Sequence, residues 1–339
     1  METIVKGMEG VQQAAEIIRR GGLVAFPTET VYGLGGNALD PEASRKIYAA
    51  KGRPSDNPLI VHVSCIDEVP PLVSEFPDSA RKLMEAFWPG PLTIVLPKAA
   101  IVPYETTGGL ETVAIRCPEN RVTLAFIKAA GVPIAGPSAN TSGKPSPTEA
   151  AHVYHDLQGK IEMILDDGPV GIGVESTIID LTGDVPTLLR PGAITVEELS
   201  ETLGTEVRID PAIIAGGVKE GVHPKAPGMK YRHYAPKAPV TVVRGNPQDT
   251  AKYIAEHIGN STGVLCFDEY REMFPTCVVE CFGSQDDLGA QAREVFDRLR
   301  AFDDTSVTQI WAQCPSDEGL GLAVANRIKK AAGFSIIEV

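Results

Sequence analysis

The 339-residue sequence lacks the patterns that mark several kinds of site and location. Its six cysteines are scattered, with no C-x-x-C pair and no zinc-ligand spacing, which is typical of buried thiols in a reducing compartment. No apolar run approaches the ~18 residues of a membrane span, and no basic segment followed by an apolar run begins the chain. We therefore expect a cytoplasmic protein that does not cross a membrane.

Two catalytic patterns are missing as well. A Walker A loop is absent because the segment from Gly136 to Pro145 has the wrong spacing and no Ser or Thr after Lys144. A G-x-S-x-G nucleophile elbow is absent too. Gly33–Ala38 matches G-x-G-x-x-A, but without a strand–turn–helix context its glycines are better interpreted as tight-turn residues. If ATP binds, a P-loop does not hold it.

Basic residues are in deficit, with 31 Lys and Arg against 44 Asp and Glu and a net charge of −13. General nucleic-acid binding depends on Lys and Arg releasing counterions from phosphates. The balance therefore argues against stable nucleic-acid binding. Any site for an anion must be a local cluster.

The order of the expected elements favours an α/β fold with more than one domain. Residues 1–208 alternate unevenly between strands and helices, which predicts a mixed sheet; within them, 27–37 is expected to be a loop. Residues 209–239 are rich in Gly, Pro, Lys and Tyr and predict a linker. The segment 240–339 alternates regularly and predicts a small Rossmann-like domain.

Local clusters of polar residues mark the candidate site. Lys51, Arg53, Asn57 and His62 lie on a proline-stiffened stretch between an expected helix and strand. Four hydroxyls, an amide and a lysine follow a buried strand in the loop 138–146, which either cradles a phosphate or caps the next helix. Arginines at strand ends, Arg116 and Arg190 among them, suit phosphate or carboxylate.

The sequence resembles the threonylcarbamoyl-AMP synthases, which have the YrdC-like fold. The motifs occur in that family's order: Lys51-x-Arg53, Pro58-Leu-Ile-Val-His62, Ser138-x-Asn140, Glu175-Ser176-Thr177 and Arg190-Pro-Gly. Residues 227–236 and the trailing domain resemble the two-domain form of the family. The resemblance implies a YrdC-like twisted mixed sheet, followed by a small Rossmann-like α/β domain.

The resemblance also implies an activity. The family makes L-threonylcarbamoyladenylate and pyrophosphate from L-threonine, bicarbonate and ATP, with Mg²⁺ on the phosphates. The product passes to a tRNA threonylcarbamoyl transferase machinery, which modifies tRNAs that read codons starting with A. No protein nucleophile is needed, since the carbamate of threonine attacks the α-phosphate itself. Charge develops on phosphate and pyrophosphate, so cations and N–H donors are expected to dominate the site.

Site residues follow from the resemblance position by position. The expected contacts to L-threonine are Thr30, His62, Arg116 (to the carboxylate), the backbone at Gly136, and Ser176. The expected contacts to ATP are Lys51, Arg53, Asn57, Thr112, Ser138, Asn140, Ser146, Arg190 and, from the linker, Tyr234, with Tyr231 as the alternative. Lys51 and Arg53 are the expected catalytic residues. Both are expected to face solvent in a cleft, so their alanine variants should lose activity and keep the fold.

Two alternatives remain at this point. YrdC-like domains also resemble binders of double-stranded RNA, but the acidic balance weighs against that function here. The same fold also forms carbamoyl-adenylate in hydrogenase maturation. That version carries acylphosphatase and zinc-finger segments, which this sequence lacks.

Overall fold

The computed structural model of the chain describes residues 2–215 and 233–339. The described residues fall into two compact units. The first unit holds residues 2–142, 147–171 and 175–215, and the second holds 143–146, 172–174 and 233–339. The central part of the predicted linker, Tyr231 included, lies outside the described residues.

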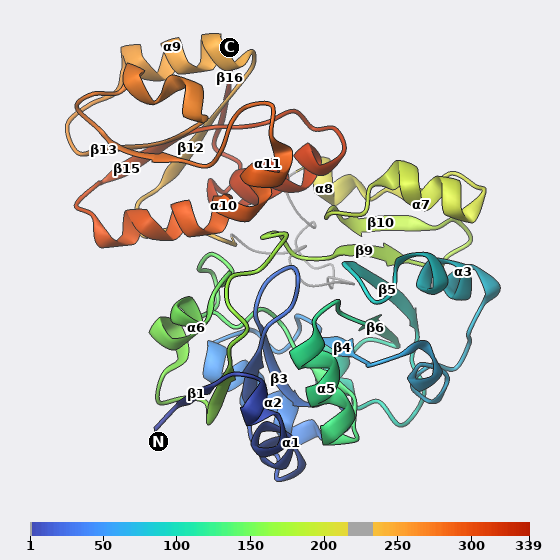
Figure 1. Ribbon diagram of the computed structural model, residues 1–339. Helices are drawn as coiled ribbons and strands as arrows, with labels where there is room; N and C mark the ends of the chain where they lie inside the picture. The colour runs from blue at the N-terminus through green and yellow to red at the C-terminus, as the bar shows by residue number, and fades with distance from the viewer. Residues whose placement is uncertain (1, 216–232) are drawn as a thin grey trace. The chain divides into compact units, whose positions relative to one another are not determined.

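The first unit is built on a mixed sheet of 11 strands (Figure 1). In spatial order the strands are β1 (Ile4–Lys6), β8 (Met163–Leu165), β2 (Val24–Phe26), β3 (Gly33–Asn37), β7 (Ile134–Ala135), β4 (Ile60–His62), β6 (Thr112–Arg116), β5 (Leu92–Pro97), β9 (Thr177–Asp180), β10 (Thr187–Arg190) and β11 (Arg208–Ile209). Near its centre, β7 runs antiparallel to both β3 and β4, whereas β4 and β6 are parallel. The predicted α/β class with a mixed sheet is confirmed.

The helices of the first unit are short. They are α1 (Val11–Arg19), α2 (Pro41–Lys51), α3 (Asp78–Phe87), α4 (Tyr104–Thr107), α5 (Arg121–Ala130), α6 (Ala150–Leu157), α7 (Val196–Leu203) and α8 (Pro211–Ala215), with 3-10 turns η1 (Met8–Gly10), η2 (Ile66–Glu68) and η3 (Pro70–Leu72). The start of α2 is the predicted one, since Asp40 accepts a hydrogen bond from the N–H of Glu42. Gly52, in the left-handed region at φ 63°, ends α2 directly after Lys51.

Helices α1 and α5 pack against each other and, with β2, enclose one of the cores. The apolar residues Val11, Ala14, Ala15 and Ile18 recur every three or four positions, so they form one buried face of α1. Phe126 of α5 contributes to the same core. Each large apolar side chain buried in this way stabilises the fold by roughly 1.5–3 kcal/mol.

The glycine-rich segment Gly33–Asn37 is a strand near the centre of the sheet, so the predicted loop over residues 27–37 is wrong at this end. The reason is packing. A Cβ built on Gly33 would lie 2.6 Å from the Phe26 ring, and one on Gly35 would lie 2.8 Å from Ile134. Glycine is therefore needed in β3 because neighbouring side chains lie against its backbone.

The second unit is built on a parallel sheet of five strands. In spatial order they are β14 (Val278–Cys281), β13 (Thr262–Cys266), β15 (Gln309–Gln313), β12 (Val240–Arg244) and β16 (Ile336–Glu338). The helices are α9 (Pro247–His257), α10 (Leu288–Ala301) and α11 (Leu320–Ala331), with 3-10 turns η4 (Asp268–Met273) and η5 (Phe302–Asp304). Figure 1 shows α9 on one face of this sheet and α10 with α11 on the other.

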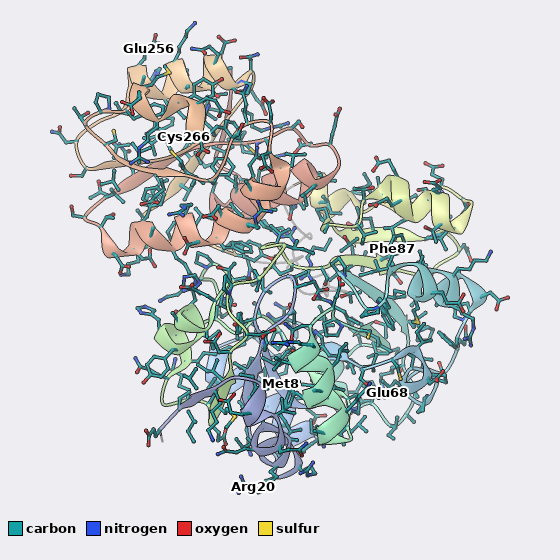
Figure 2. The ribbon with its side chains drawn as sticks, in the orientation of Figure 1. Met8, Arg20, Glu68, Phe87, Glu256 and Cys266 are labelled. Atoms are coloured by element: carbon teal, nitrogen blue, oxygen red, sulfur yellow. The ribbon has the colours of Figure 1, made fainter. Side chains whose placement is uncertain are left out.

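The element order of the second unit is the predicted alternation of strands and helices. Cys266, labelled in Figure 2, is buried on β13, and its sulfur lies 3.9 Å from that of Cys281 on the neighbouring strand. All six cysteines are free thiols, as expected from their scattered positions.

Candidate functional site

The first cluster gathers around Lys51 at the end of α2. The Lys51 ammonium donates to the backbone oxygens of Ser138 and Asn140, the latter at 2.5 Å. The Ser138 hydroxyl donates to Asn140 Oδ1 at 2.5 Å, so this loop is also tied internally. The fold thus brings together three of the predicted ATP residues, which we call the lysine cluster: Lys51, Ser138 and Asn140.

The predicted exposure of Lys51 and Arg53 is wrong. Their exposed fractions are 2% and 8%, so both cations are buried. The Arg53 guanidinium donates to the backbone oxygens of Asn57 (3.3 Å) and Pro58 (3.1 Å). Backbone oxygens therefore accept hydrogen bonds from both cations, and these hydrogen bonds offset part of the free-energy cost of burying a charge.

Asn57, in the same loop, carries a buried acceptor. Its side chain is 1% exposed, and Oδ1 accepts no hydrogen bond from the part of the chain that the structure describes. An orphaned buried polar atom of this kind costs roughly 1–3 kcal/mol. Asn57 Oδ1 is thus suited to accept from a ligand, and its assignment to ATP stays a prediction.

His62 and Arg116 lie side by side, because parallel strands β4 and β6 pair these two residues in register. The His62 ring packs edge-on against Phe26, with centroids 5.2 Å apart, and its Nδ1 lies 3.3 Å from the oxygen of Ile134. Burial, together with the charge of Arg116, lowers the pKa of His62 to about 3. The imidazole is therefore neutral at physiological pH.

Arg116 is held by three neighbours. It donates to the Thr30 hydroxyl through Nη1 at 2.9 Å and to the Gly90 oxygen through Nε at 3.3 Å. Its Nη2 lies 2.6 Å from Oε1 of Glu29, an ion pair that is close but not aligned as a hydrogen bond. Glu29 was not among the predicted residues, since nothing in the local sequence links it to a cation 87 positions away.

A second arginine meets Ser176. Arg190 donates to the Ser176 backbone oxygen through Nε and to its hydroxyl through Nη2, both at 3.0 Å. The Ser176 hydroxyl also lies 2.8 Å from that of Thr93 on β5. Antiparallel register places Thr93 on β5 opposite Arg116 on β6, and β5 and β9 lie between the strands of Arg116 and Arg190. Predicted threonine and ATP contacts thus adjoin each other here.

Predicted site residues of the first unit lie at both ends of the strand pair β4–β6. Thr112 begins β6, two residues before the Ile60–Ala114 pair, and so lies at the Asn57 end of the two strands. Arg116 is at the other end, about 13 Å away at ~3.3 Å per residue. Gly136 donates its N–H to the Ile60 oxygen at 2.8 Å, and a Cβ there would lie 2.9 Å from the Phe26 ring.

Ser146 and Tyr234 belong to the second unit, which is described by itself. Ser146 is fully buried. The Tyr234 ring packs on Phe296 of α10, with centroids 5.0 Å apart, and on His233 at 5.3 Å. The assignment of both residues to ATP stays a prediction.

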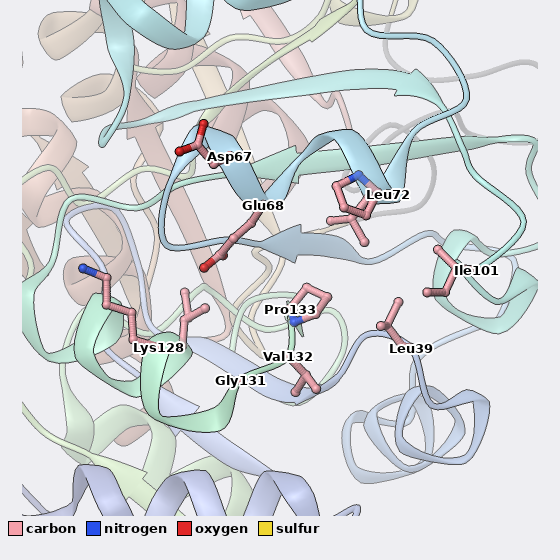
Figure 3. A pocket seen from close by; sticks show the side chains of 11 residues that line it. Leu39, Asp67, Glu68, Leu72, Ile101, Lys128, Gly131, Val132 and Pro133 are labelled. Carbon is pink, nitrogen blue, oxygen red and sulfur yellow. The ribbon is translucent and has the colours of Figure 1, made fainter.

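A cavity of about 380 Å³ also lies in the first unit (Figure 3). Its walls are mainly apolar, with Glu68 and Lys128 at one side; the lining residues are Leu39, Asp67, Glu68, Pro71, Leu72, Ile101, Ile127, Lys128, Gly131, Val132 and Pro133. None of the predicted site residues lines it. We therefore place the candidate site at the lysine cluster and the two arginines rather than at this cavity.

In residues 2–215 and 233–339, no group of three or more His, Cys, Asp or Glu side chains is placed to hold a metal ion. Within the same ranges, no helix is long and apolar enough to cross a membrane.

Comparisons with known proteins cover almost the whole chain. The family model described as "Telomere recombination" matches residues 16–192, and that described as "Threonylcarbamoyl-AMP synthase, C-terminal domain" matches residues 194–333. A threonylcarbamoyl-AMP synthase of Pyrococcus abyssi is 49% identical over 97% of this chain and 96% of its own length. One of Bacillus subtilis is 47% identical over 96% of this chain and 94% of its own.

Solved structures give the same picture. The crystal structure of P. abyssi Sua5 complexed with L-threonine is 47% identical and superposes with a TM-score of 0.93 over 99% of this chain and 100% of that one. E. coli YciO is 25% identical, with a TM-score of 0.53 over 58% of this chain and 98% of its own. The P. abyssi and B. subtilis relatives thus match nearly the whole of this chain, whereas YciO matches only part of it.

Proposed function

Because the chain belongs to the threonylcarbamoyl-AMP synthase family, we propose that it converts L-threonine, bicarbonate and ATP to L-threonylcarbamoyladenylate and pyrophosphate. Two observations carry the proposal: buried Arg116 lies beside the neutral His62, and Lys51 gathers Ser138 and Asn140, all within the first unit. The end-to-end likeness to a Sua5 structure that holds L-threonine supports the choice of amino acid.

The amino acid binds at the Arg116 end of the β4–β6 pair. The Arg116 guanidinium takes its carboxylate, and Thr30, Ser176 and the Gly136 backbone contact the rest of the molecule. His62 is buried and neutral, so it contributes a polar nitrogen without adding charge. The amine of threonine adds to bicarbonate, which gives a carbamate and water. A carbamate oxygen then bonds to the α-phosphorus of ATP as the bond to pyrophosphate breaks.

ATP binds along the lysine cluster and the Arg53–Asn57 loop, with Thr112, Ser146 and Arg190 completing the contacts. Lys51 fixes residues 138–140 through its hydrogen bonds to two of their backbone oxygens, which positions the Ser138 hydroxyl and the Asn140 side chain for the phosphates. Arg53 fixes its own loop in the same way. Charge develops on the phosphates during transfer, and preorganised donors stabilise it without reorganising.

Mg²⁺ enters this reaction as the counter-ion of ATP, bound mainly by phosphate oxygens and water. Chelating Mg²⁺ should therefore stop pyrophosphate release while leaving the unfolding temperature of the ligand-free protein unchanged. An unchanged rate in excess chelator would contradict this part of the proposal.

The linker around Tyr234 covers the nucleotide and excludes water from a product that hydrolyses readily. The reason is its composition, which is too aromatic and cationic for an idle tether. Cutting the chain after residue 208 should shorten product lifetime and slow synthesis. An unchanged product lifetime and an unchanged rate of synthesis would refute this role of the linker.

In the cytoplasm, the product then passes to the machinery that transfers the threonylcarbamoyl group to tRNA.

Pyrophosphate release tests the proposal most simply. ATP is supplied with Mg²⁺, and L-threonine and bicarbonate are omitted in turn. Release should require both. Release that does not depend on threonine would sink the proposed function.

A further inference from the structure

Glu29 is a buried carboxylate in the threonine site to which the reaction scheme above gives no role. Its side chain is 10% exposed. Neither of its oxygens accepts an aligned hydrogen bond from the described part of the chain, although Oε1 lies 2.6 Å from Arg116 Nη2. Both oxygens of a buried carboxylate ordinarily accept hydrogen bonds, because an uncompensated charge in a protein interior is costly.

The loop holds Glu29 in place between two threonines. The Thr28 hydroxyl accepts from the N–H groups of Thr30 and Val31, both at 3.1 Å, and donates to the Val31 oxygen at 2.5 Å. Arg116 then binds the Thr30 hydroxyl from the other side. The carboxylate of Glu29 is therefore attached to a backbone that its neighbours fix, next to the guanidinium that receives the substrate.

The charges of this pocket match those of an α-amino acid. Arg116 is positive and Glu29 is negative, while His62 is neutral because burial lowers its pKa to about 3. An α-amino acid carries its ammonium and carboxylate on one carbon, so the two charges lie side by side as those of Arg116 and Glu29 do. Arg116 Nη2 also lacks an aligned acceptor, which leaves it able to bind a carboxylate.

We propose that Glu29 binds the α-ammonium group of the amino-acid substrate, so that Arg116 and Glu29 form a paired receptor for an amino-acid zwitterion. The inference rests on the proposed function for the identity of the site. The substrate's ammonium supplies the donors that the Glu29 oxygens lack. Glu29 also fixes the position of this nitrogen, which loses a proton to water before it reacts, as the free amine, with bicarbonate.

The test compares ligands that lack one charge. Calorimetry without ATP measures the full-length wild type, Glu29→Gln and a matched control, Glu119→Gln, whose glutamate is exposed three residues after Arg116. The ligands are L-threonine and 3-hydroxybutanoate, which is threonine without its amine. Glu29→Gln should weaken threonine binding roughly 10- to 100-fold, as expected for a hydrogen bond to a charged group, and change 3-hydroxybutanoate binding less than about twofold. Glu119→Gln should bind both as the wild type does.

Three results would overturn the proposal. Equal weakening of both ligands by Glu29→Gln means that Glu29 only orients Arg116. Unchanged or tighter threonine binding means that Glu29 competes with the substrate carboxylate. If Glu29→Gln does not fold, the comparison uses the wild type alone, and the third result is a wild type that binds threonine less than about 10-fold more tightly than 3-hydroxybutanoate. Pyrophosphate release by the wild type is measured in parallel. If pyrophosphate is not released but the ligands bind in the expected pattern, the proposed function is wrong and the proposal that Arg116 and Glu29 bind an amino acid stands.

Discussion

Replacing Lys51 by Met should destabilise the first unit as well as abolish activity. Methionine has a similar length but no donor, so the backbone oxygens of Ser138 and Asn140 lose the ammonium that they now share. Each buried acceptor that loses this donor should cost roughly 1–3 kcal/mol, which gives about 4 kcal/mol for the two. For a unit of this size, that corresponds to a fall of roughly 8–16 °C in the unfolding temperature.

The matched control is Lys82→Met, at an exposed position on α3. Scanning calorimetry of the wild type and both variants gives the temperatures, and pyrophosphate release gives the activities. The control should stay within about 2 °C of the wild type, since surface substitutions usually change stability by less than ~0.5 kcal/mol. Loss of activity in Lys51→Met at an unchanged unfolding temperature would refute the reasoning, because it would mean that Lys51 contacts the ligand rather than the loop.

Two further predictions address His62 and the central strand. Since the pKa of His62 is about 3 in the fold and ~6.5 in the unfolded chain, only the unfolded state takes up a proton between these values, so stability falls as the pH is lowered through this window. Between pH 6.5 and 5, the free energy of unfolding measured with urea should fall by about 2 kcal/mol more for the wild type than for His62→Gln. The control His155→Gln, at an exposed position, should behave like the wild type. An equal fall for the wild type and His62→Gln would disprove a buried neutral imidazole. Gly33→Ala should cost roughly 1–3 kcal/mol because its Cβ would lie 2.6 Å from Phe26, whereas Gly171→Ala, with nothing within 4 Å, should be neutral in the same assay. Equal stabilities of these two alanine variants would show that β3 does not pack on Phe26.

The sequence predicted what is encoded over short distances. The capped start of α2 and the strand–helix alternation of residues 240–339 depend on neighbouring residues, and both are confirmed. The strand Gly33–Asn37 was missed because its glycines are explained by Phe26 and Ile134, which local propensity does not include.

The burial of the cations was missed for a similar reason. Lys51 is covered by carbonyls 87 and 89 positions away, so no pattern around residue 51 reveals its partners. Glu29 was not predicted because its partner Arg116 lies far away in the sequence, on another strand. Motif resemblance brought the predicted residues together, but only the sheet register shows that His62, Arg116 and Thr93 form one row.

The most direct test of the proposed function follows the carbon of bicarbonate. Wild-type protein is incubated with L-threonine, Mg²⁺–ATP and ¹⁴C-labelled bicarbonate, and the adenylate product is separated. We predict that the label enters an adenylate that contains threonine, in equal amount to the pyrophosphate released. An unlabelled adenylate, or pyrophosphate release without incorporation of label, would contradict the proposed reaction.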